Sequence, residues 1–577
     1  MPLWRLYIMK VSVSKSKNQT IYYLSKSVWV NGKSTTKTIE KIGSEEEIKK
    51  ICGDLSPLTW AKQYAAKRSA EEKASKNDII IKYSSSSRIE KETCRTVNVG
   101  YLFLKDIYYD LGVDTICKEI AGKYKFEYDL NDILSMLVFT RVIYPGSKKS
   151  SLDLSQKFLE KPCCGLHQVY RALEILAKEN DFFQSQLYKN SEQVVARQRG
   201  IIYYDCTNYY FEIEEEDDFR KYGHSKEHRP NPVVQMGMFM DADGIPLTFS
   251  VFNGNENEQS SMRPLEKKII SDFGLRKVIV CTDAGLSSTP NRLFNNTAAR
   301  RFVTTQSIKK LNGFLKEFCL ADDGWHLSGS RKTYKLSELD ENDHYDKMFY
   351  KDRWINEGGL EQHLIVTFSF KYRRYQRMIR ARQLERAAKL AGNPSSLKRS
   401  RQNDPKRFIR QEHCTSDGEV ADRMIASIDE SLVREEEQYD GFYAVCTNLE
   451  DDVSAVISIN RKRWQIEECF RIMKSEFHAR PVYLSRKDRI TAHFITCFAA
   501  LIIYRILEKK LGGDYTCEEI IRTIREMNML VIPGEGYIPE YTRTDLTDRL
   551  HDLFGFRTDY EIVSQRNMKK ILTAAKK

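Results

Sequence analysis

The sequence predicts an α/β protein in which helices flank a mixed sheet that is interrupted by a β-rich insertion. Three patterns predict it: alternating apolar and polar residues near the start, helical spacing over the next hundred residues, and short apolar runs separated by amphipathic segments after residue 200. At 577 residues the chain can bury a large core, and its 30% charged residues argue against an integral membrane protein.

Residues 1–90 are expected to form a β-rich unit and a tether. Apolar and polar residues alternate over residues 21–43, and Asn31-Gly32 is a typical hairpin turn. The polar stretch from residue 66 onward predicts the tether.

Residues 91–199 are expected to form a helical domain. Leucine, valine and isoleucine recur there at three- and four-residue spacing, most clearly in residues 167–179. Lys148 and Lys149 follow a Pro-Gly pair, which suits a contact with a nucleic-acid backbone, although lysines in loops also serve solubility alone.

The sheet is expected in two parts. Residues 200–308 read as strand, strand, strand, helix, strand, helix, strand, which predicts a mixed sheet covered by helices. The alternation fails over residues 309–450, which we interpret as an insertion. Residues 451–512 supply a helix over 453–474 and an apolar helix that is too short to span a bilayer, and residues 513–577 form a carboxyl-terminal region.

The excess positive charge is concentrated in the insertion. Residues 371–410 contain 14 Lys and Arg against two acids, which equals the net charge of +12 of the whole chain. Such a block attracts a polyanion through counterion release, so nucleic acid is the expected partner. The alternative is a solvated charged helix.

Two aspartates follow apolar strands of the predicted sheet. Asp205 ends the run GIIYYD and Asp283 ends VIVCTD. Because ligand and catalytic groups gather at the carboxyl ends of strands in open α/β sheets, the two acids suggest a shared site. Either aspartate alone is better explained as a residue that stabilises a turn or caps the next helix.

A helix over residues 463–474 offers a third acid. At about 100° per residue, four large residues form one apolar stripe: Ile466, Phe470, Met473 and Phe477. Glu467 borders this stripe beside Arg463 and Lys474, whereas Glu468 is expected to face solvent. The alternative is that both cations simply pair with Glu467 along the helix.

These residues resemble the RNase H-like core of DDE transposases from bacterial insertion sequences, in the branch that carries a β-rich insertion. Arg463, Glu467 and Lys474 fit its Tyr-x2-Arg-x3-Glu-x6-Lys signature, with Asn460 at the tyrosine position. Other similar stretches are YYDCTNYYFE, GHSKEHRPN, TDAGLSS, RFVTTQS, DGFYAVCTN and MKSEFHARPVYL.

The resemblance implies that Asp205, Asp283 and Glu467 are catalytic metal ligands. They would hold two Mg²⁺ ions, which Mn²⁺ can replace, for cleavage at the element ends and joining of the 3'-hydroxyl to target DNA. Zinc is a weaker alternative, because His224 and His228 have a suitable spacing but lie in a predicted loop.

The resemblance also implies double-stranded DNA as the partner, with the amino-terminal domains on the terminal repeats and a homodimer on DNA. Trp325 and Trp354 in the insertion are candidates for stacking on an extruded base, although an isolated tryptophan is more often a core residue. The expected DNA contacts are Arg463, Lys474, Arg471, His224, Lys226, Arg229, Arg373, Arg374, Arg377 and Arg380.

Two other functions remain open from the sequence: a transposase-derived DNA-binding protein that has lost catalysis, and an RNase H-like nuclease. The amino terminus has no signal-peptide pattern, so we expect a cytoplasmic protein without a membrane partner, associated with the bacterial nucleoid.

Overall fold

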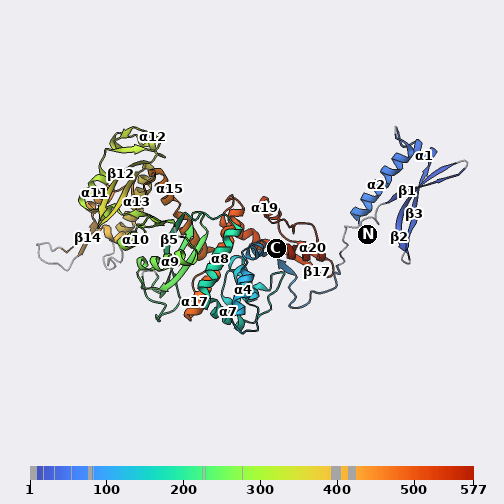
Figure 1. The fold of residues 1–577 in the computed structure, drawn as a ribbon, viewed down its shortest axis with the longest axis horizontal. Helices are drawn as coiled ribbons and strands as arrows, with labels where there is room; N and C mark the ends of the chain where they lie inside the picture. The colour runs from blue at the N-terminus through green and yellow to red at the C-terminus, as the bar shows by residue number, and fades with distance from the viewer. Residues whose placement is uncertain are drawn as a thin grey trace. The chain divides into compact units, whose positions relative to one another are not determined.

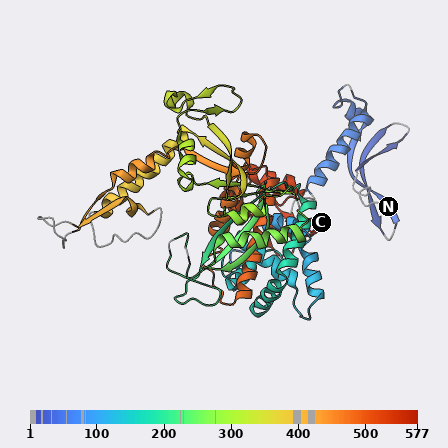
Figure 2. The same ribbon diagram turned by 60° about the vertical axis from the view of Figure 1, so that its left-hand side comes forward.

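The computed structural model describes residues 9–16, 19–30, 33–53, 55–75, 81, 83–223, 225–227, 229–275, 277–391, 404–413 and 424–576. The chain forms two compact units (Figures 1 and 2). The first comprises residues 1–95, 531–538 and 559–567, and the second contains the rest.

The first unit is built on an antiparallel meander of β1 (Lys10–Lys15), β2 (Thr20–Val30) and β3 (Lys33–Ser44). Helices α1 (Glu45–Lys49) and α2 (Pro57–Ser75) pack against it around Tyr22, Leu24 and Ile48. The tether prediction is wrong for residues 66–75, because α2 continues through them. The predicted turn at residues 31–32 lies outside the described residues.

Six helices open the second unit: α3 (Tyr101–Asp110), α4 (Val113–Gly122), α5 (Leu130–Ile143), α6 (Lys148–Ser155), α7 (Leu166–Lys178) and α8 (Asn180–Val194). The apolar α17 (Lys487–Lys510) contacts α3, α5 and α7. By length and composition α17 would suit a membrane, but 94% of its apolar window is buried in the protein, as expected of a core helix.

A mixed sheet forms the centre of the second unit. Its strands β7 (Pro246–Asn253), β6 (Val233–Asp241), β5 (Ile201–Tyr210), β8 (Val278–Thr282) and β9 (Arg300–Gln306) lie side by side in that order. β5, β8 and β9 are parallel, whereas β6 is antiparallel to both neighbours. With α9 (Glu258–Asp272) and α10 (Thr289–Phe294), this is the predicted RNase H-like order.

The insertion extends the same sheet. β16 (Phe442–Thr447) pairs antiparallel with β9, and β13 (Leu360–Phe368), β12 (Phe349–Glu357), β10 (Trp325–Leu327) and β11 (Thr333–Tyr334) continue it to ten strands. The long α13 (Phe370–Ala391) leaves β13, and β14 (Ile409–His413) pairs with β15 (Met424–Ile428) beyond it. Shorter helices complete the insertion: η2 (Ile308–Lys310), α11 (Gly313–Leu320), η3 (Leu336–Glu338), α12 (Glu341–His344), η5 (Pro405–Phe408) and α14 (Glu430–Glu437).

The helix predicted over residues 453–474 is not continuous. It consists of α15 (Val453–Arg461), α16 (Trp464–Arg471) and one π-helical segment, η6 (Ile472–Glu476). After α17, the chain forms α18 (Cys517–Glu526), β17 (Asn528–Ile532), β18 (Gly536–Pro539), α19 (Asp545–Phe554), β19 (Val563–Ser564) and α20 (Gln565–Ala574), and β17 pairs with β4 (Thr96–Asn98).

Candidate active site

Asp205 and Asp283 lie at the same end of two neighbouring parallel strands. β5 and β8 pair through Ile201–Tyr203, so Asp205 lies two residues beyond this pairing, and Asp283 directly follows β8. The prediction that Asp205 ends its strand is wrong, because β5 runs on to Tyr210 along its antiparallel partner β6.

The alternation of β5 directs Asp205 away from α9. Tyr204 and Cys206 are buried in the core cluster that includes residues of α9. On the other face, the Tyr203 hydroxyl donates to the Ile459 carbonyl, and the Tyr209 hydroxyl lies 3.7 Å from the Met473 sulfur. Asp205 therefore shares the face that α15 and η6 cover.

Glu467 joins the two aspartates from the first turn of α16. All three carboxylates line one cavity of about 500 Å³, together with Arg463 and Lys474. Arg463 pairs with Glu467 at 3.0 Å (Nη2 to Oε1), which holds this carboxylate beside the cavity.

The exposures of the two adjacent glutamates are the reverse of the prediction. The Glu467 side chain is 57% exposed, whereas Glu468 is 25% exposed and bonded to Arg471 at 2.6 Å. The prediction assumed that helix side chains away from the apolar stripe face solvent. Asp205 and Asp283, however, line a cavity on one side of that stripe. Glu467 faces that cavity, and Glu468 is not among its lining residues.

Burial sets the protonation of Asp205. It raises the pKa of this carboxyl to about 6, with Lys226 opposing the rise and Asp283 adding to it. Burial alone would lower the pKa of Lys226, but the charges of Asp205 and Glu258 outweigh it and raise that pKa. Lys226 also donates to the Cys206 carbonyl.

Lys474 lies in the π-helical segment and lines the same cavity. Its Nζ donates to the Thr207 hydroxyl at 2.5 Å and lies 3.7 Å from Glu227. Burial and the neighbouring Lys226 lower the pKa of Lys474 to about 8, while Asp205 opposes the shift. The ammonium thus lies next to the first aspartate.

The donor set fits a hard divalent cation. Asp205 Oδ1 accepts from the Cys206 amide at 2.8 Å, and Asp283 Oδ1 accepts from the Leu286 amide at 2.9 Å. Among the described residues, the Oδ2 atoms have no hydrogen-bond donor, which leaves them available to a ligand. Carboxylate oxygens are the ligands that Mg²⁺ and Mn²⁺ prefer.

Residues 201–503 match the family model described as the transposase DDE domain, and this match spans more than half of the chain. The chain belongs to this family. Among solved structures, a piggyBac transposase synaptic complex with hairpin DNA is 9% identical, with 85% of this chain and 88% of that chain covered at a TM-score of 0.37. No curated protein sequence matches significantly.

The remaining predicted contacts of the DDE domain separate into two groups. Arg463, Lys226, Lys474 and Arg471 line the cavity of the three carboxylates. Arg229 lies elsewhere, with its guanidinium 4.2 Å from the centre of the Tyr210 ring. His224, and with it the zinc alternative that also needs His228, falls outside the described residues.

The basic helix α13 is only partly available to DNA. Arg374 and Arg377 are exposed, and Arg373 pairs with Glu341 at 2.8 Å. The prediction for Arg380 is wrong: it is 7% exposed and makes a bidentate pair with Asp440. Asp440 lies 60 residues further along the chain, so the sequence pattern of the helix did not reveal it. Residues 392–403 of the basic block lie outside the described residues.

One of the two predicted stacking tryptophans is a core residue. Trp325 is fully buried in the insertion, where its indole donates to the Ala321 carbonyl at 2.9 Å. Its assignment to base stacking is therefore wrong. Trp354 is 44% exposed and stacks on His363 at 5.0 Å between ring centres.

A second cavity, which the sequence did not predict, adjoins the carboxylates. It has a volume of about 620 Å³ and includes Arg463 and Glu467 in its wall. Four aromatic residues also line it: Tyr372, Tyr375, Tyr443 and Trp464. Tyr372 and Tyr375 were hidden in the basic block, where charge dominated the pattern.

Tyr443 lies beside Asn460. The Asn460 amide donates to the Tyr443 hydroxyl at 3.0 Å, and that hydroxyl also forms a hydrogen bond with the Thr305 hydroxyl at 2.6 Å. The Tyr443 hydroxyl of β16 thus links Asn460 on α15 to Thr305 on β9.

Proposed function

We propose that this protein is an active transposase that binds the terminal repeats of an insertion sequence, cleaves DNA at the element ends and joins the 3'-hydroxyl to target DNA. One observation carries the proposal: Asp205, Asp283 and Glu467, distant in sequence, line a single cavity together with five cations. Acids for metal ions and cations for phosphates are the groups that phosphoryl transfer requires.

Asp205, Asp283 and Glu467 would hold two Mg²⁺ ions, or Mn²⁺ in their place. When bound, such ions activate the attacking oxygen and stabilise the leaving oxygen of an in-line displacement. The alternating face of β5 orients Asp205, and the Arg463 pair orients Glu467. The Leu286 amide fixes Asp283 directly after its strand.

The cations around the carboxylates would bind the DNA strand. Lys226 and Lys474 lie on the Asp205 side of the cavity, and Arg463 lies on the Glu467 side. Fixed positive charge near the reacting phosphate stabilises the charge that develops on its oxygens. The partly buried Lys474 is held by Thr207, so little rearrangement is needed.

The aromatic cavity supports a role in holding an extruded base. Its four rings lie directly beside Glu467, whereas Trp325 is buried in the core. Stacking on an aromatic side chain stabilises a base that has left the duplex. Tyr372, Tyr375 and Trp464 are therefore stronger stacking candidates than Trp325, and Trp354 stays a candidate.

The decisive experiment measures nicking and strand transfer on a duplex that carries the element end, with Mg²⁺. We expect Asp205→Asn, Asp283→Asn and Glu467→Gln to abolish nicking, and Glu468→Gln to retain it. Binding without nicking by the unaltered protein would favour a DNA-binding protein that has lost catalysis. Nicking without joining of a pre-cut end would favour a nuclease.

Two further features follow from the proposed reaction. Cutting and joining two element ends needs two active sites, which a homodimer on double-stranded DNA supplies. The protein would act in the bacterial cytoplasm on the nucleoid. Sedimentation of the protein with and without element-end DNA tests the dimer.

A further inference from the structure

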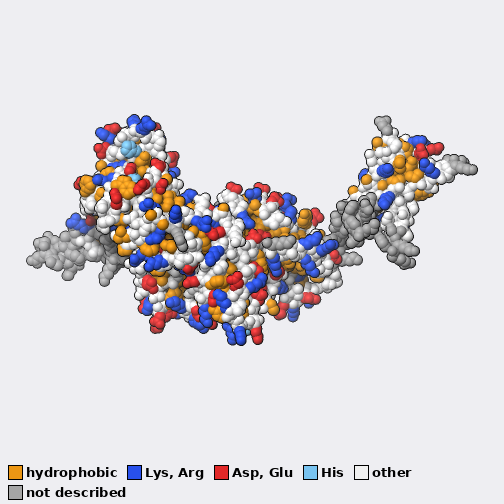
Figure 3. All heavy atoms as spheres, viewed as in Figure 1, with side chains coloured by type: hydrophobic (Ala, Val, Ile, Leu, Met, Phe, Trp, Pro, Cys, Tyr) orange, Lys and Arg blue, Asp and Glu red, His pale blue; other side chains and the backbone are white. Residues whose placement is uncertain are grey.

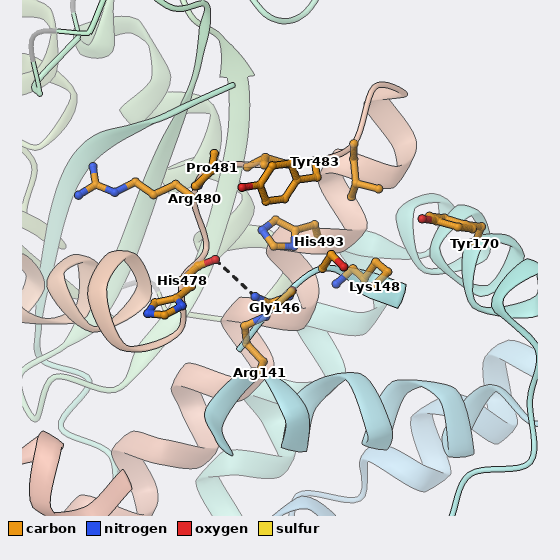
Figure 4. Close-up of a pocket in the computed structure, with 12 residues that line it drawn as sticks. Arg141, Gly146, Lys148, Tyr170, His478, Arg480, Pro481, Tyr483 and His493 are labelled. Carbon is orange, nitrogen blue, oxygen red and sulfur yellow. Dashed lines mark hydrogen bonds between the residues drawn. The ribbon is translucent and has the colours of Figure 1, made fainter. Parts of the chain in front are cut away.

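A separate cavity of about 280 Å³ lies where the helical region meets the chain that follows the catalytic helix (Figure 4). Its wall comes from five places: Arg141 on α5, the turn and first residue of α6 at 146–148, Tyr170 on α7, His493 on α17, and the loop at 478–484. Figure 4 shows Lys148 extending toward Gly146 and His493, with Tyr170 on the far side.

Lys148 is buried in this cavity without a counter-ion. The residue is 4% exposed, and its Nζ has no hydrogen-bond partner among the described residues. Burial and the neighbouring Arg141 lower the pKa of this amine to about 7. Among the described residues that line the cavity, none is an aspartate or a glutamate.

Arg141 adds a permanent charge and builds the wall. It is 1% exposed and donates to the carbonyls of Phe477, His478 and Gly146, at 3.0, 3.4 and 3.0 Å. These bonds tie the 478–484 loop to the turn before α6. Arginine remains charged in proteins, so this part of the cavity is positive at every physiological pH.

His493 adds a neutral ring. Its Nε2 donates to the Ala479 carbonyl at 3.1 Å, because a carbonyl can only accept. Burial, together with Lys148 and Arg141, lowers the pKa of the ring well below its usual range. The other nitrogen, Nδ1, is then an acceptor.

Burying an ammonium with no acceptor is unfavourable unless an anion offsets its lost hydration. The amino-terminal end of α6, where Ser147 caps the helix, faces the same cavity and favours negative charge. A compact oxyanion satisfies both requirements. The restricted volume suits one phosphate group rather than an extended acidic chain.

We propose that the Lys148 cavity binds a phosphate group of the DNA strand that occupies the active site. Arg480 makes the connection, because it lines both this cavity and the cavity of the three carboxylates. Its guanidinium points away from Lys148 in Figure 4 and pairs with Glu227, which also lies near Lys474. The proposal rests on the proposed function, since it assigns a second phosphate of the same strand.

Lys148→Met and Lys149→Met form a matched pair, because Lys149 is the next residue and is exposed. Two probes are used at constant ionic strength: inorganic phosphate, read by thermal melting, and an element-end duplex, read by equilibrium binding in Ca²⁺. We expect Lys148→Met to lose the stabilisation by phosphate and to bind the duplex about tenfold more weakly. Lys149→Met should match the unaltered protein in both.

Lys148→Met should also melt at a higher temperature than the unaltered protein in the absence of phosphate, because it removes a buried, unpaired charge. Lys148→Arg should keep most of the duplex affinity. If Lys148→Met does not fold, a competition assay between inorganic phosphate and the duplex is carried out on the unaltered protein instead. Absence of competition in that assay would overturn the proposal.

The outcomes separate the sources of the phosphate and the two proposals. Loss of phosphate stabilisation with unchanged duplex affinity would show a site for free phosphate and overturn the DNA assignment. Unchanged behaviour of Lys148→Met in both assays would overturn the site itself. Weakened duplex binding by Lys148→Met in a protein that never nicks DNA would support the cavity and refute the proposed catalysis.

Discussion

The two cavities that share Arg480 differ in their balance of charge. The cavity of the three carboxylates combines acids with several cations, whereas the Lys148 cavity contains cations and, among its described lining residues, no acid. The first arrangement suits metal ions together with a phosphate, and the second suits a phosphate alone. The unbalanced charge of the residues that line a cavity therefore indicates the ligand better than the volume of the cavity does.

Metal removal should separate the two cavities most strongly. Chelation with EDTA should reduce nicking of the element end by about a thousandfold or more, because carboxylates alone supply no activated oxygen. The increase in melting temperature that inorganic phosphate causes should stay unchanged after chelation, since the Lys148 cavity needs no metal. Nicking that survives chelation would remove the metal role from Asp205, Asp283 and Glu467.

Stability should depend on pH with opposite signs at the two cavities. The pKa of Lys148 is lowered to about 7 in the folded protein, so between about pH 7 and 10 only the unfolded chain holds this proton. Stability therefore rises with pH there, by up to about 1.4 kcal/mol per pH unit. The neighbouring Arg141 and Arg480 stay charged over this pH range. The nearby Cys497 is a thiol whose pKa is raised by burial.

Asp205 should show the reverse in metal-free buffer. Its pKa is raised to about 6 in the folded protein, so between about pH 4 and 6 the folded state holds the extra proton and stability falls as pH rises. Melting curves of Lys148→Met and Asp205→Asn should each lack one of these slopes. If the pH dependence assigned to Lys148 persists in Lys148→Met, or the one assigned to Asp205 persists in Asp205→Asn, another group is responsible for that titration.

The smallest effect concerns two exposed arginines of the basic helix α13, Arg374 and Arg377, which line neither the cavity of the three carboxylates nor the Lys148 cavity. Replacing the exposed Arg374 and Arg377 by glutamine should reduce the slope of log affinity against log salt by about two for duplex DNA. The control is Arg380→Gln, which should lower stability rather than the slope, because it removes the bidentate partner of the buried Asp440 and leaves this carboxylate with Arg377, whose Nε lies 3.6 Å away. An unchanged slope in the double variant would show that these arginines of α13 face solvent and do not contact DNA phosphates.

Local patterns predicted the central sheet well. The order of elements over residues 200–308 is confirmed, since each strand is a short apolar run bounded by turn residues. The three carboxylates were proposed from local features: Asp205 and Asp283 end short apolar runs of sequence, although β5 continues past Asp205 to Tyr210, and Glu467 lies beside an apolar helical stripe. The structure brings these three together in one cavity.

Features that depend on distant partners were missed. Arg380 appeared exposed because its partner Asp440 lies on another segment, and Trp325 appeared isolated although it packs in the insertion core. The exposures of Glu467 and Glu468 were reversed, since a helical projection contains no cavity. The Lys148 cavity needs Arg141 and His493 from two other helices, and only the turn before Lys148 indicated it.

The continuous ten-stranded sheet makes the insertion hard to remove. β16 covers the outer edge of β9, and β13 covers β16 in turn. Excising residues 309–441 would keep β9 paired with β16. It would, however, leave β16, an apolar strand that is mostly buried in the intact protein, as the exposed edge of the sheet. Such borders recruit strands from other molecules. A shortened chain should therefore self-associate through β16, because the insertion normally covers this edge of the central sheet.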